Sequence, residues 1–306
     1  MKPPAGFDGL LELAQSRPKA RLGVVGADNE TALQAVSAAI ALDLVTPVLF
    51  GHEDDVRARI ERDETDGASL MAAAEFVDSA DPAVAAAAAA SEGQVDILLK
   101  GALRTDQVLR AVLDKNSGLR TGRLLSDILL YEDVLSGSPR LVAITDGGIT
   151  IAPDLKQKRE IVANAAEVLR KLGFARPRIA VMSATEVVSK ALQSTLDAEQ
   201  LTAEGERGDF GECDVYGPLA LDNALLPSAA EAKGIVNAVA GRADCLVAPT
   251  IEAGNLLGKS AKFFTGSRCA HVIVGAGVPV LIPSRVESAD DKLLSIAFGV
   301  IANDSL

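Results

Sequence analysis

The stretch Leu281-Ile-Pro-Ser-Arg-Val-Glu-Ser-Ala-Asp-Asp291 joins an apolar run to an amphipathic segment, and the interpretation of the whole chain starts from it. The run before it, residues 271–282, is rich in Val and Ile, as in a buried strand. In the segment after it, apolar residues recur at the helical period. In α/β proteins a strand that leads into a helix N-terminus often binds an anionic ligand. We therefore expect a ligand site here, where Arg285 offers a guanidinium suited to phosphate or carboxylate.

Ser288 and Asp291 have the Ser-x-x-Asp spacing of a helix capping box. Ser288 would be the N-cap and Asp291 would occupy the third helical position. Asp291 thus has a structural interpretation that must be weighed against any chemical role.

The composition favours a large α/β protein. The chain has 306 residues, enough for two domains, and 48% of them are hydrophobic but only 3% aromatic. A core of Ala, Val, Leu and Ile suits parallel strands covered by helices. The net charge of −12 argues against a nucleic-acid partner, which would require a basic face.

Neither a signal peptide nor a membrane span is expected from the sequence, because no stretch has the required apolar length and flanks. Cys213, Cys245 and Cys269 show no paired spacing, which indicates a reduced, cytoplasmic setting. The two histidines are His52 and His271, and no Cys-x-x-Cys or His-x-x-x-His occurs, so we expect no metal site. His271, at the start of an apolar run, is interpreted as structural.

Strand and helix patterns alternate along the chain, which predicts an α/β fold with mostly parallel sheets and flanking helices. Asp81-Pro82 predicts the start of a helix through the alanine run 85–90. Residues 131–139 are expected to form a connection, residues 202–214 a glycine-rich loop and residues 229–240 a helix. Strands are expected at residues 21–26, 47–50, 95–99, 140–145, 179–182 and 244–248.

Polar residues follow many of these apolar runs, at the points where the strands are expected to end. Because carboxyl ends of parallel strands share an edge of the sheet, so many polar residues indicate a common cleft. Complete Rossmann, P-loop and Gly-x-Ser-x-Gly motifs are absent from the sequence. The residues in question are Lys100, Thr145, Asp146, Ser183, Asp222, Asn223, Glu252, Asn255, Ser284 and Arg285.

Several short motifs extend this pattern over residues 95–300. They are Leu99-Lys-Gly-Ala102 with Thr105 and Arg110, Thr145-Asp-Gly-Gly148 with Pro153-Asp154, Met182-Ser183, Tyr216-Gly-Pro-Leu-Ala-Leu-Asp-Asn223, Ala248-Pro-Thr-Ile-Glu-Ala-Gly-Asn255 and Ser284-Arg285. In this order, the motifs resemble the phosphate acetyltransferase/phosphate butyryltransferase family.

The resemblance implies a two-domain α/β fold like that of the isocitrate and isopropylmalate dehydrogenases. It implies a first domain of residues 1–138 plus 284–306, a second of residues 139–283, and an active-site cleft between them. It further implies a homodimer that catalyses acyl-CoA + phosphate ⇌ acyl phosphate + CoA, with CoA as a substrate and no cofactor.

The same resemblance suggests roles for individual residues. Ser284 and Arg285 match the family's Ser-Arg pair, and Arg110 matches its phosphate-side arginine. Asp291 stands at the position of the acid proposed to accept the CoA thiol proton. Lys100, Thr145, Ser183 and Asn255 are the further candidates for binding phosphate and CoA.

The acyl group is left open as acetyl or butyryl. The alanine run replaces a basic stretch of the longer acetyltransferases, whereas Asp291 is not a feature of the butyryl-type members. Two other functions are also retained: a non-catalytic acyl-CoA-binding or regulatory protein on the same fold, and a metal- and NAD-dependent 2-hydroxyacid dehydrogenase.

Overall fold

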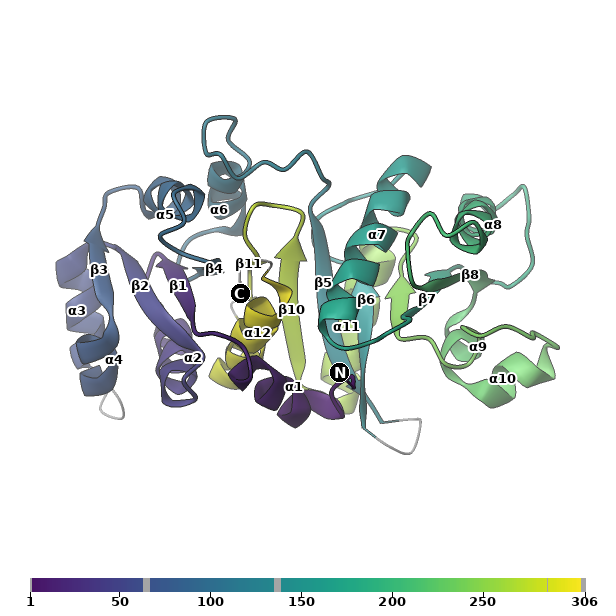
Figure 1. Cartoon of the computed structure of the whole chain (residues 1–306), viewed down its shortest axis with the longest axis horizontal. Coiled ribbons are helices and arrows are strands. Elements are labelled where there is room, and N and C mark those ends of the chain that lie inside the picture. The colour runs from purple at the N-terminus through teal and green to yellow at the C-terminus, as the bar shows by residue number, and fades with distance from the viewer. Residues whose placement is uncertain (1, 63–66, 135–138, 285, 304–306) are drawn as a thin grey trace. The chain divides into compact units, whose positions relative to one another are not determined.

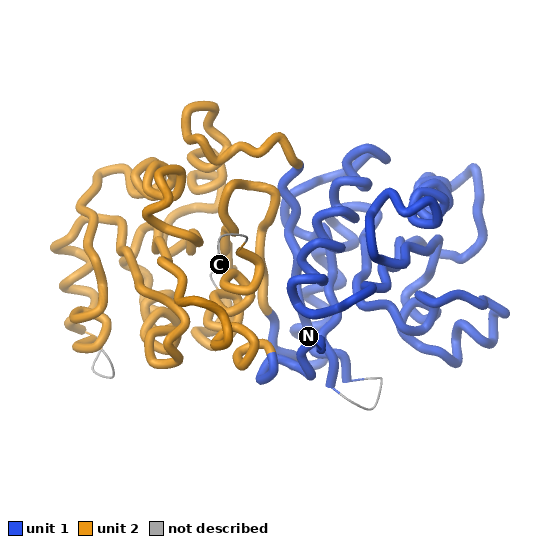
Figure 2. The backbone as a smooth tube through the Cα atoms, viewed as in Figure 1, with its two compact units in different colours: residues 1–9, 124–269 blue, residues 10–123, 270–306 orange. Residues whose placement is uncertain are grey.

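Strands and helices alternate along the chain, and they are divided between two units (Figures 1 and 2). The computed structural model describes residues 2–62, 67–134, 139–284 and 286–303. Unit 1 consists of residues 1–9 and 124–269, and unit 2 of residues 10–123 and 270–306. The C-terminal segment therefore belongs to the same unit as most of the N-terminal part.

The sheet of unit 2 has the strand order β3-β2-β1-β4-β11-β10. Its strands pair in parallel except for β10, which runs antiparallel to β11. Helix α12 packs on α2, and α5 packs on α6. The strands are β1 (Ala20–Val25), β2 (Val45–Gly51), β3 (Glu75–Asp78), β4 (Ile97–Lys100), β10 (Cys269–Val274) and β11 (Val280–Leu281). The helices are α2 (Glu30–Ala41), α3 (Glu53–Glu61), α4 (Gly67–Ala73), α5 (Pro82–Ser91), α6 (Thr105–Val112) and α12 (Ala289–Ala302). A further helix, α1 (Gly6–Gln15), contains the boundary at Gly9.

The sheet of unit 1 has the order β5-β6-β9-β7-β8, in which only the β5–β6 pair is antiparallel. Helices α7 and α11 contact β5, and α8 contacts β7 and β8. The strands are β5 (Ser126–Asp133), β6 (Arg140–Thr145), β7 (Arg178–Met182), β8 (Asp214–Leu219) and β9 (Cys245–Val247). The helices are α7 (Leu155–Lys171), α8 (Gln193–Glu206), α9 (Leu221–Leu225), α10 (Pro227–Ala232) and α11 (Ile251–Thr265).

The central strands are buried along nearly their whole length, as parallel strands covered on both faces require. All four residues of β4 are buried, and so are the residues of β9. These short runs, apolar except for Lys100, are the patterns from which strands were expected, and the predicted mostly parallel α/β class is confirmed. The finer likeness to the isocitrate and isopropylmalate dehydrogenases stays a prediction.

Polar side chains cap the starts of α2 and α5, the second of them at the predicted Asp81. The Asn29 side chain accepts a hydrogen bond from the Ala32 backbone N–H at the start of α2. Asp81 does the same for Val84 at the start of α5, where Pro82 occupies the first turn. Apolar residues of α5 pack on β1 and β2, so the alanine run serves as a close-packing helix.

Three expected elements are wrong. Residues 131–139 were expected to form a connection, but β5 continues to Asp133, whose carboxylate lies 2.9 Å from Arg140 Nε. Residues 202–214 were expected to form a loop, but α8 continues to Glu206 and includes Gly205, where a Cβ would lie 2.8 Å from the Val215 Cβ. The helix expected at residues 229–240 ends at Ala232, since Gly234 has a φ of +66°.

The expected domain division placed residues 124–138 in the first domain and residues 270–283 in the second. In the structure β5 pairs with β6, which places it in unit 1. Strand β11 pairs with β4, which places it in unit 2.

No helix within the described ranges combines the length and the apolar character needed to cross a bilayer.

Candidate active site

The carboxyl edge of the unit 2 sheet carries two of the predicted site residues. Strands β1, β4 and β11 are in parallel register, with Val25 opposite Lys100 and Leu99 opposite Leu281. Lys100 ends β4, and Ser284 follows shortly after β11 ends at Leu281. Because the strands run in the same direction, the residues that follow them emerge at one edge.

Lys100 is held at this edge in a confined position. Its side chain is almost buried, and its Nζ lies 3.5 Å from the Gly101 carbonyl oxygen. A Cβ on Gly101 would lie 2.0 Å from the Gly26 carbonyl oxygen, so only glycine permits this approach of the β1 and β4 ends. The sequence Lys100-Gly101 thus places a cation beside a tightly packed strand end.

The segment from Ser284 to α12 is held by its own hydrogen bonds. The Glu287 backbone N–H donates to the Ser284 carbonyl oxygen at 3.1 Å. Ser288 is the N-cap of α12, and its hydroxyl accepts from the Asp291 backbone N–H at 3.1 Å. Arg285, the other half of the predicted pair, lies outside the described residues.

Asp291 completes the capping box, as predicted. Its Oδ2 accepts from the Ser288 hydroxyl at 2.8 Å and from the Ser288 backbone N–H at 3.4 Å. The residue is only 6% exposed. Its carboxylate is therefore fixed at a helix N-terminus, where negative charge is stabilised.

Arg110 occupies a different position in unit 2, on α6. Its side chain is 81% exposed, and its guanidinium lies 3.8 Å from Asp106, one turn earlier. It lines a hollow of about 720 Å³ whose other walls include Leu103 and three alanines of α5, namely Ala83, Ala87 and Ala88. The hollow has an apolar wall, and its lining also includes the acidic residues Asp81, Glu92 and Asp114.

Unit 1 brings together Thr145, Ser183 and Asn255 at the carboxyl edge of its own sheet. Thr145 ends β6 and Ser183 follows β7; both strands pair in parallel with β9. Asn255, on α11, donates from Nδ2 to the Gly147 carbonyl oxygen at 3.1 Å. The Ser183 hydroxyl lies 2.8 Å from that of Ser194.

A buried carboxylate, Asp146, lies at the same edge of unit 1. It accepts backbone hydrogen bonds from Gly148 and Ile149 at 2.9 Å and from Thr150 at 3.1 Å. Burial, and secondly the nearby Asp127 carboxylate, nevertheless raise the pKa of Asp146 from 3.8 to about 6. The hydroxyls of Thr145 and Thr150 are buried without a hydrogen-bond partner in the described part of the chain. This edge therefore has buried polar groups that a ligand could engage.

The sequence matches a known family, described as phosphate acetyl/butaryl transferase, over residues 20–300. The chain belongs to this family. It is 35% identical over 298 residues to a phosphate butyryltransferase of Clostridium beijerinckii, covering 96% of this chain and 97% of that one. It is 36% identical over 301 residues to a phosphate acetyltransferase of Rhizobium meliloti, covering 97% and 93%. A branched-chain phosphotransacylase from Enterococcus faecalis V583 has a similar structure, with a TM-score of 0.80, 30% identity and coverage of 92% and 98%. The predicted family is thereby confirmed.

Within this phosphate acetyl/butaryl transferase, the predicted site residues form groups that belong to separate units. Lys100 and Ser284 share the unit 2 edge, whereas Thr145, Ser183 and Asn255 share the unit 1 edge. A single cleft containing both groups stays a prediction.

Sequence reasoning missed two buried polar groups. Asp127, in β5, was overlooked because that strand start was not recognised. Lys292 is 3% exposed, and its Nζ donates to the Glu287 carbonyl oxygen at 2.8 Å and to the Thr31 hydroxyl at 2.5 Å. The sequence feature that could have indicated the buried Lys292 is its position next to the apolar stripe of the last helix.

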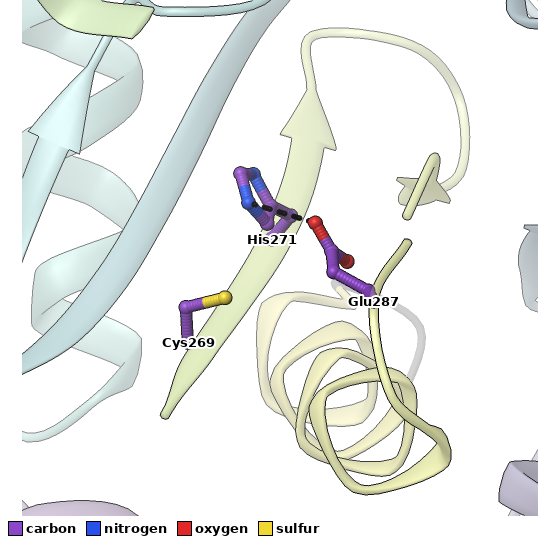
Figure 3. A group of neighbouring side chains, drawn as sticks. All are labelled: Cys269, His271 and Glu287. Carbon is purple, nitrogen blue, oxygen red and sulfur yellow. Dashed lines mark ion pairs between the residues drawn. The ribbon is translucent and has the colours of Figure 1, made fainter. Parts of the chain in front are cut away.

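A further group, also not foreseen from the sequence, consists of three side chains of the types that can bind a metal ion. Cys269, His271 and Glu287 place a thiol, an imidazole and a carboxylate close together (Figure 3). The signal in the sequence was the Cys-x-His spacing at the start of a strand, which places both side chains on one face.

Proposed function

We propose that the chain transfers a short acyl group reversibly between CoA and inorganic phosphate, giving acyl phosphate and free CoA. The main support is the family match over residues 20–300, which includes the strand-end motifs and the segment of Ser284. That segment follows a strand of a parallel sheet and leads into a helix N-terminus, a favourable place for an anion.

In the proposed reaction a phosphate oxygen attacks the thioester carbonyl, and the CoA sulfur leaves. The Ser284 hydroxyl donates a hydrogen bond to the developing oxyanion. Arg285 and Arg110 hold the phosphate and orient it for attack. In the reverse direction the CoA sulfur attacks the acyl phosphate and phosphate leaves.

Asp291 is proposed to accept the CoA thiol proton in the reverse direction and to return it in the forward direction. A free thiol has a pKa of about 8.5 and a free carboxylate about 4, so complete transfer in water would be uphill by roughly 6 kcal/mol. Transfer therefore accompanies attack on the carbonyl rather than preceding it. A carboxylate fixed by Ser288 suits this role, because its orientation is set before the substrate arrives.

The remaining candidates are proposed to bind substrate. Lys100 offers a cation at the unit 2 edge, and Thr145, Ser183 and Asn255 offer hydrogen-bonding groups at the unit 1 edge. The substrates are acyl-CoA, inorganic phosphate and acyl phosphate, and the proposal includes no cofactor. By the family resemblance the active form is a homodimer, and the spacing of the cysteines favours a cytoplasmic setting.

The test is phosphate-dependent release of free CoA from a panel of acetyl-CoA, butyryl-CoA and a branched-chain acyl-CoA. We expect thiol release to require phosphate and to be matched by acyl phosphate. Binding of acyl-CoA without turnover would support the non-catalytic alternative. NAD reduction that requires a divalent metal and a 2-hydroxyacid would support the dehydrogenase.

Arg110 and Arg104 provide a matched pair of variants for the binding proposal. Both guanidiniums lie near Asp106, at 3.8 and 2.9 Å respectively, but only Arg110 lines the hollow. We expect Arg110→Ala to raise the KM for phosphate or CoA by about tenfold or more, and Arg104→Ala to change it less than about twofold. Equal effects of the two substitutions would contradict a specific role for Arg110.

A further inference from the structure

Cys269, His271 and Glu287 form a compact group of possible metal ligands around β10 (Figure 3). One ligand atom from each lies within 4.8 Å of the others, and His271 Nε2 is 3.7 Å from Glu287 Oε1. Cys269 and His271 are two positions apart on one strand, so their side chains project from the same face. Glu287 comes from the turn just before α12.

The burial of Glu287 is a separate indication that this group binds a ligand. The residue is 6% exposed, and its Oε2 has no hydrogen-bond partner among the residues that the structure describes. Burying a carboxylate oxygen without a partner destabilises a protein, so such atoms usually have a ligand, an ion or a water molecule. Cys269 is 1% exposed. Its sulfur and the Glu287 carboxylate are therefore both shielded from water that would compete with them for a metal ion.

We propose that Cys269, His271 and Glu287 bind one Zn²⁺ ion per chain. Thiolate, imidazole and carboxylate together are typical zinc ligands, whereas Mg²⁺ and Ca²⁺ prefer oxygen alone. Metal–ligand distances of about 2.0–2.3 Å require ligand atoms roughly 3.3–3.8 Å apart, so the distances between the ligand atoms must shorten by up to about 1.5 Å. Three protein ligands leave a fourth position for water, and binding releases the thiol proton.

Lys262 gives the proposal a further consequence. Its Nζ lies 3.4 Å from Cys269 Sγ, where a positive charge opposes a metal cation. Removing that charge therefore strengthens zinc binding. Substitution of a ligand should therefore weaken zinc binding, whereas substitution of Lys262 should strengthen it.

The ion is a structural one and takes no part in acyl transfer. The backbone of Glu287 makes two hydrogen bonds near the proposed catalytic residues. Its N–H donates to the Ser284 carbonyl oxygen, and its carbonyl oxygen accepts from Lys292 Nζ. An ion that joins Glu287 to β10 holds this segment against the sheet. Because the ion binds the folded chain, it raises the melting temperature.

The experiment uses the full chain, stripped with a chelator and titrated with Zn²⁺ or Co²⁺. Bound metal is measured by elemental analysis and calorimetry, and thiolate ligation by the sulfur-to-cobalt charge-transfer absorption. The variants are Cys269→Ser, His271→Asn, Glu287→Gln and Lys262→Gln. The matched controls are Cys213→Ser, another buried thiol, and His52→Asn, a histidine 3.9 Å from Asp78 at an exposed position.

We expect one tightly bound ion per wild-type chain, a higher melting temperature with Zn²⁺ and a cobalt–thiolate band. Each ligand variant should weaken binding by about tenfold or more, Cys269→Ser should abolish the band, and Lys262→Gln should strengthen binding. The controls should leave binding unchanged.

The cobalt spectrum of the wild-type chain requires no substitution, so a variant that fails to fold does not prevent a decision. A wild-type chain that binds zinc more weakly than about 1 mM, or binds cobalt without a thiolate band, overturns the proposal. So does a zinc affinity that the three ligand substitutions leave within about twofold.

Discussion

Replacing Asp291 with asparagine separates its role as a helix cap from its proposed role in catalysis. In the wild type the Ser288 hydroxyl lies 2.8 Å from Asp291 Oδ2. Asparagine keeps the shape of the side chain and one acceptor for this hydroxyl, but it cannot accept a proton. The loss of charge at the N-terminus of α12 should cost about 1 kcal/mol. In a chain of this size that lowers the melting temperature by only about 2–4 °C. If Asp291 accepts the thiol proton, turnover should fall by about a hundredfold or more.

Two variants serve as controls for this prediction. Asp290→Asn removes an exposed charge from the same helical turn, so it should match the electrostatic effect on stability without affecting turnover. Ser288→Ala removes the hydroxyl that orients Asp291, so it should lower both stability and turnover. The assay is CoA release with saturating phosphate, alongside thermal melting. An Asp291→Asn chain that melts earlier but turns over at the wild-type rate would show that Asp291 is a cap only. The double variant with Asp290→Asn tests whether the neighbouring acid substitutes for it.

Three further predictions concern binding, pH and assembly. Arg285→Ala should raise the KM for phosphate far more than Arg285→Lys, because a guanidinium can make paired hydrogen bonds to phosphate; unchanged phosphate kinetics in the alanine variant would contradict this. The Asp146 pKa is raised from 3.8 to about 6, so its contribution to stability is present in full below pH 3.8 and is lost as the pH rises through 6. The lost contribution to the free energy of unfolding amounts to about 3 kcal/mol. Urea unfolding of the wild type and of Asp146→Asn across pH 4–7 would measure it. If the free energies of unfolding of the two proteins changed in parallel with pH, the result would contradict this prediction. Light scattering at micromolar concentration should give the mass of a dimer, and the mass of one chain would refute this.

The sequence predicted the strands that are apolar throughout and the helices with clear caps. The strands β4 and β9 could be recognised because their residues are apolar, apart from Lys100 at the end of β4, and all of them are buried. Strand β5 could not, because its polar residues are satisfied by distant partners. Asn164, 38 positions away in the sequence, donates to the Ser126 hydroxyl at 2.7 Å. Asp133 is paired with Arg140 across the β5–β6 hairpin. Such pairings are tertiary, so local pattern cannot reveal them.

Glycines were the other source of error in predicting helices and loops. A glycine can allow close packing inside a helix, or it can take a positive φ that ends one. Gly205 was interpreted as part of a loop but lies in a helix, where a Cβ would come within 2.8 Å of Val215. Gly234 was interpreted as helical but takes a positive φ just after α10 ends. Whether a glycine is needed for a turn or for close packing depends on its neighbours in space, which the sequence does not list.

Strand-end reasoning found many of the candidate site residues but not the contacts that hold them. Lys100, Thr145 and Ser183 were expected at carboxyl edges because each follows an apolar run, and the strand registers confirm that position. The group of Cys269, His271 and Glu287 was not foreseen, because Cys269 and His271 only become informative when Glu287 is brought beside them. Whether residues from different helices and strands lie close together depends on the tertiary structure, so local sequence patterns do not reveal it.

The segment between Ser284 and Asp291 is fixed by polar contacts whose partners come from several elements. Lys292 donates both to the Glu287 carbonyl oxygen and to Thr31, a residue 261 positions earlier in the sequence. These two hydrogen bonds join the start of α12 to the residue before its N-cap and to α2. Glu287 is in turn bonded to Ser284, and Asp291 to Ser288. Glu287, Ser288 and Asp291 are therefore held before any substrate binds, and a reaction that consists mainly of orienting phosphate against a thioester benefits directly from such preorganisation.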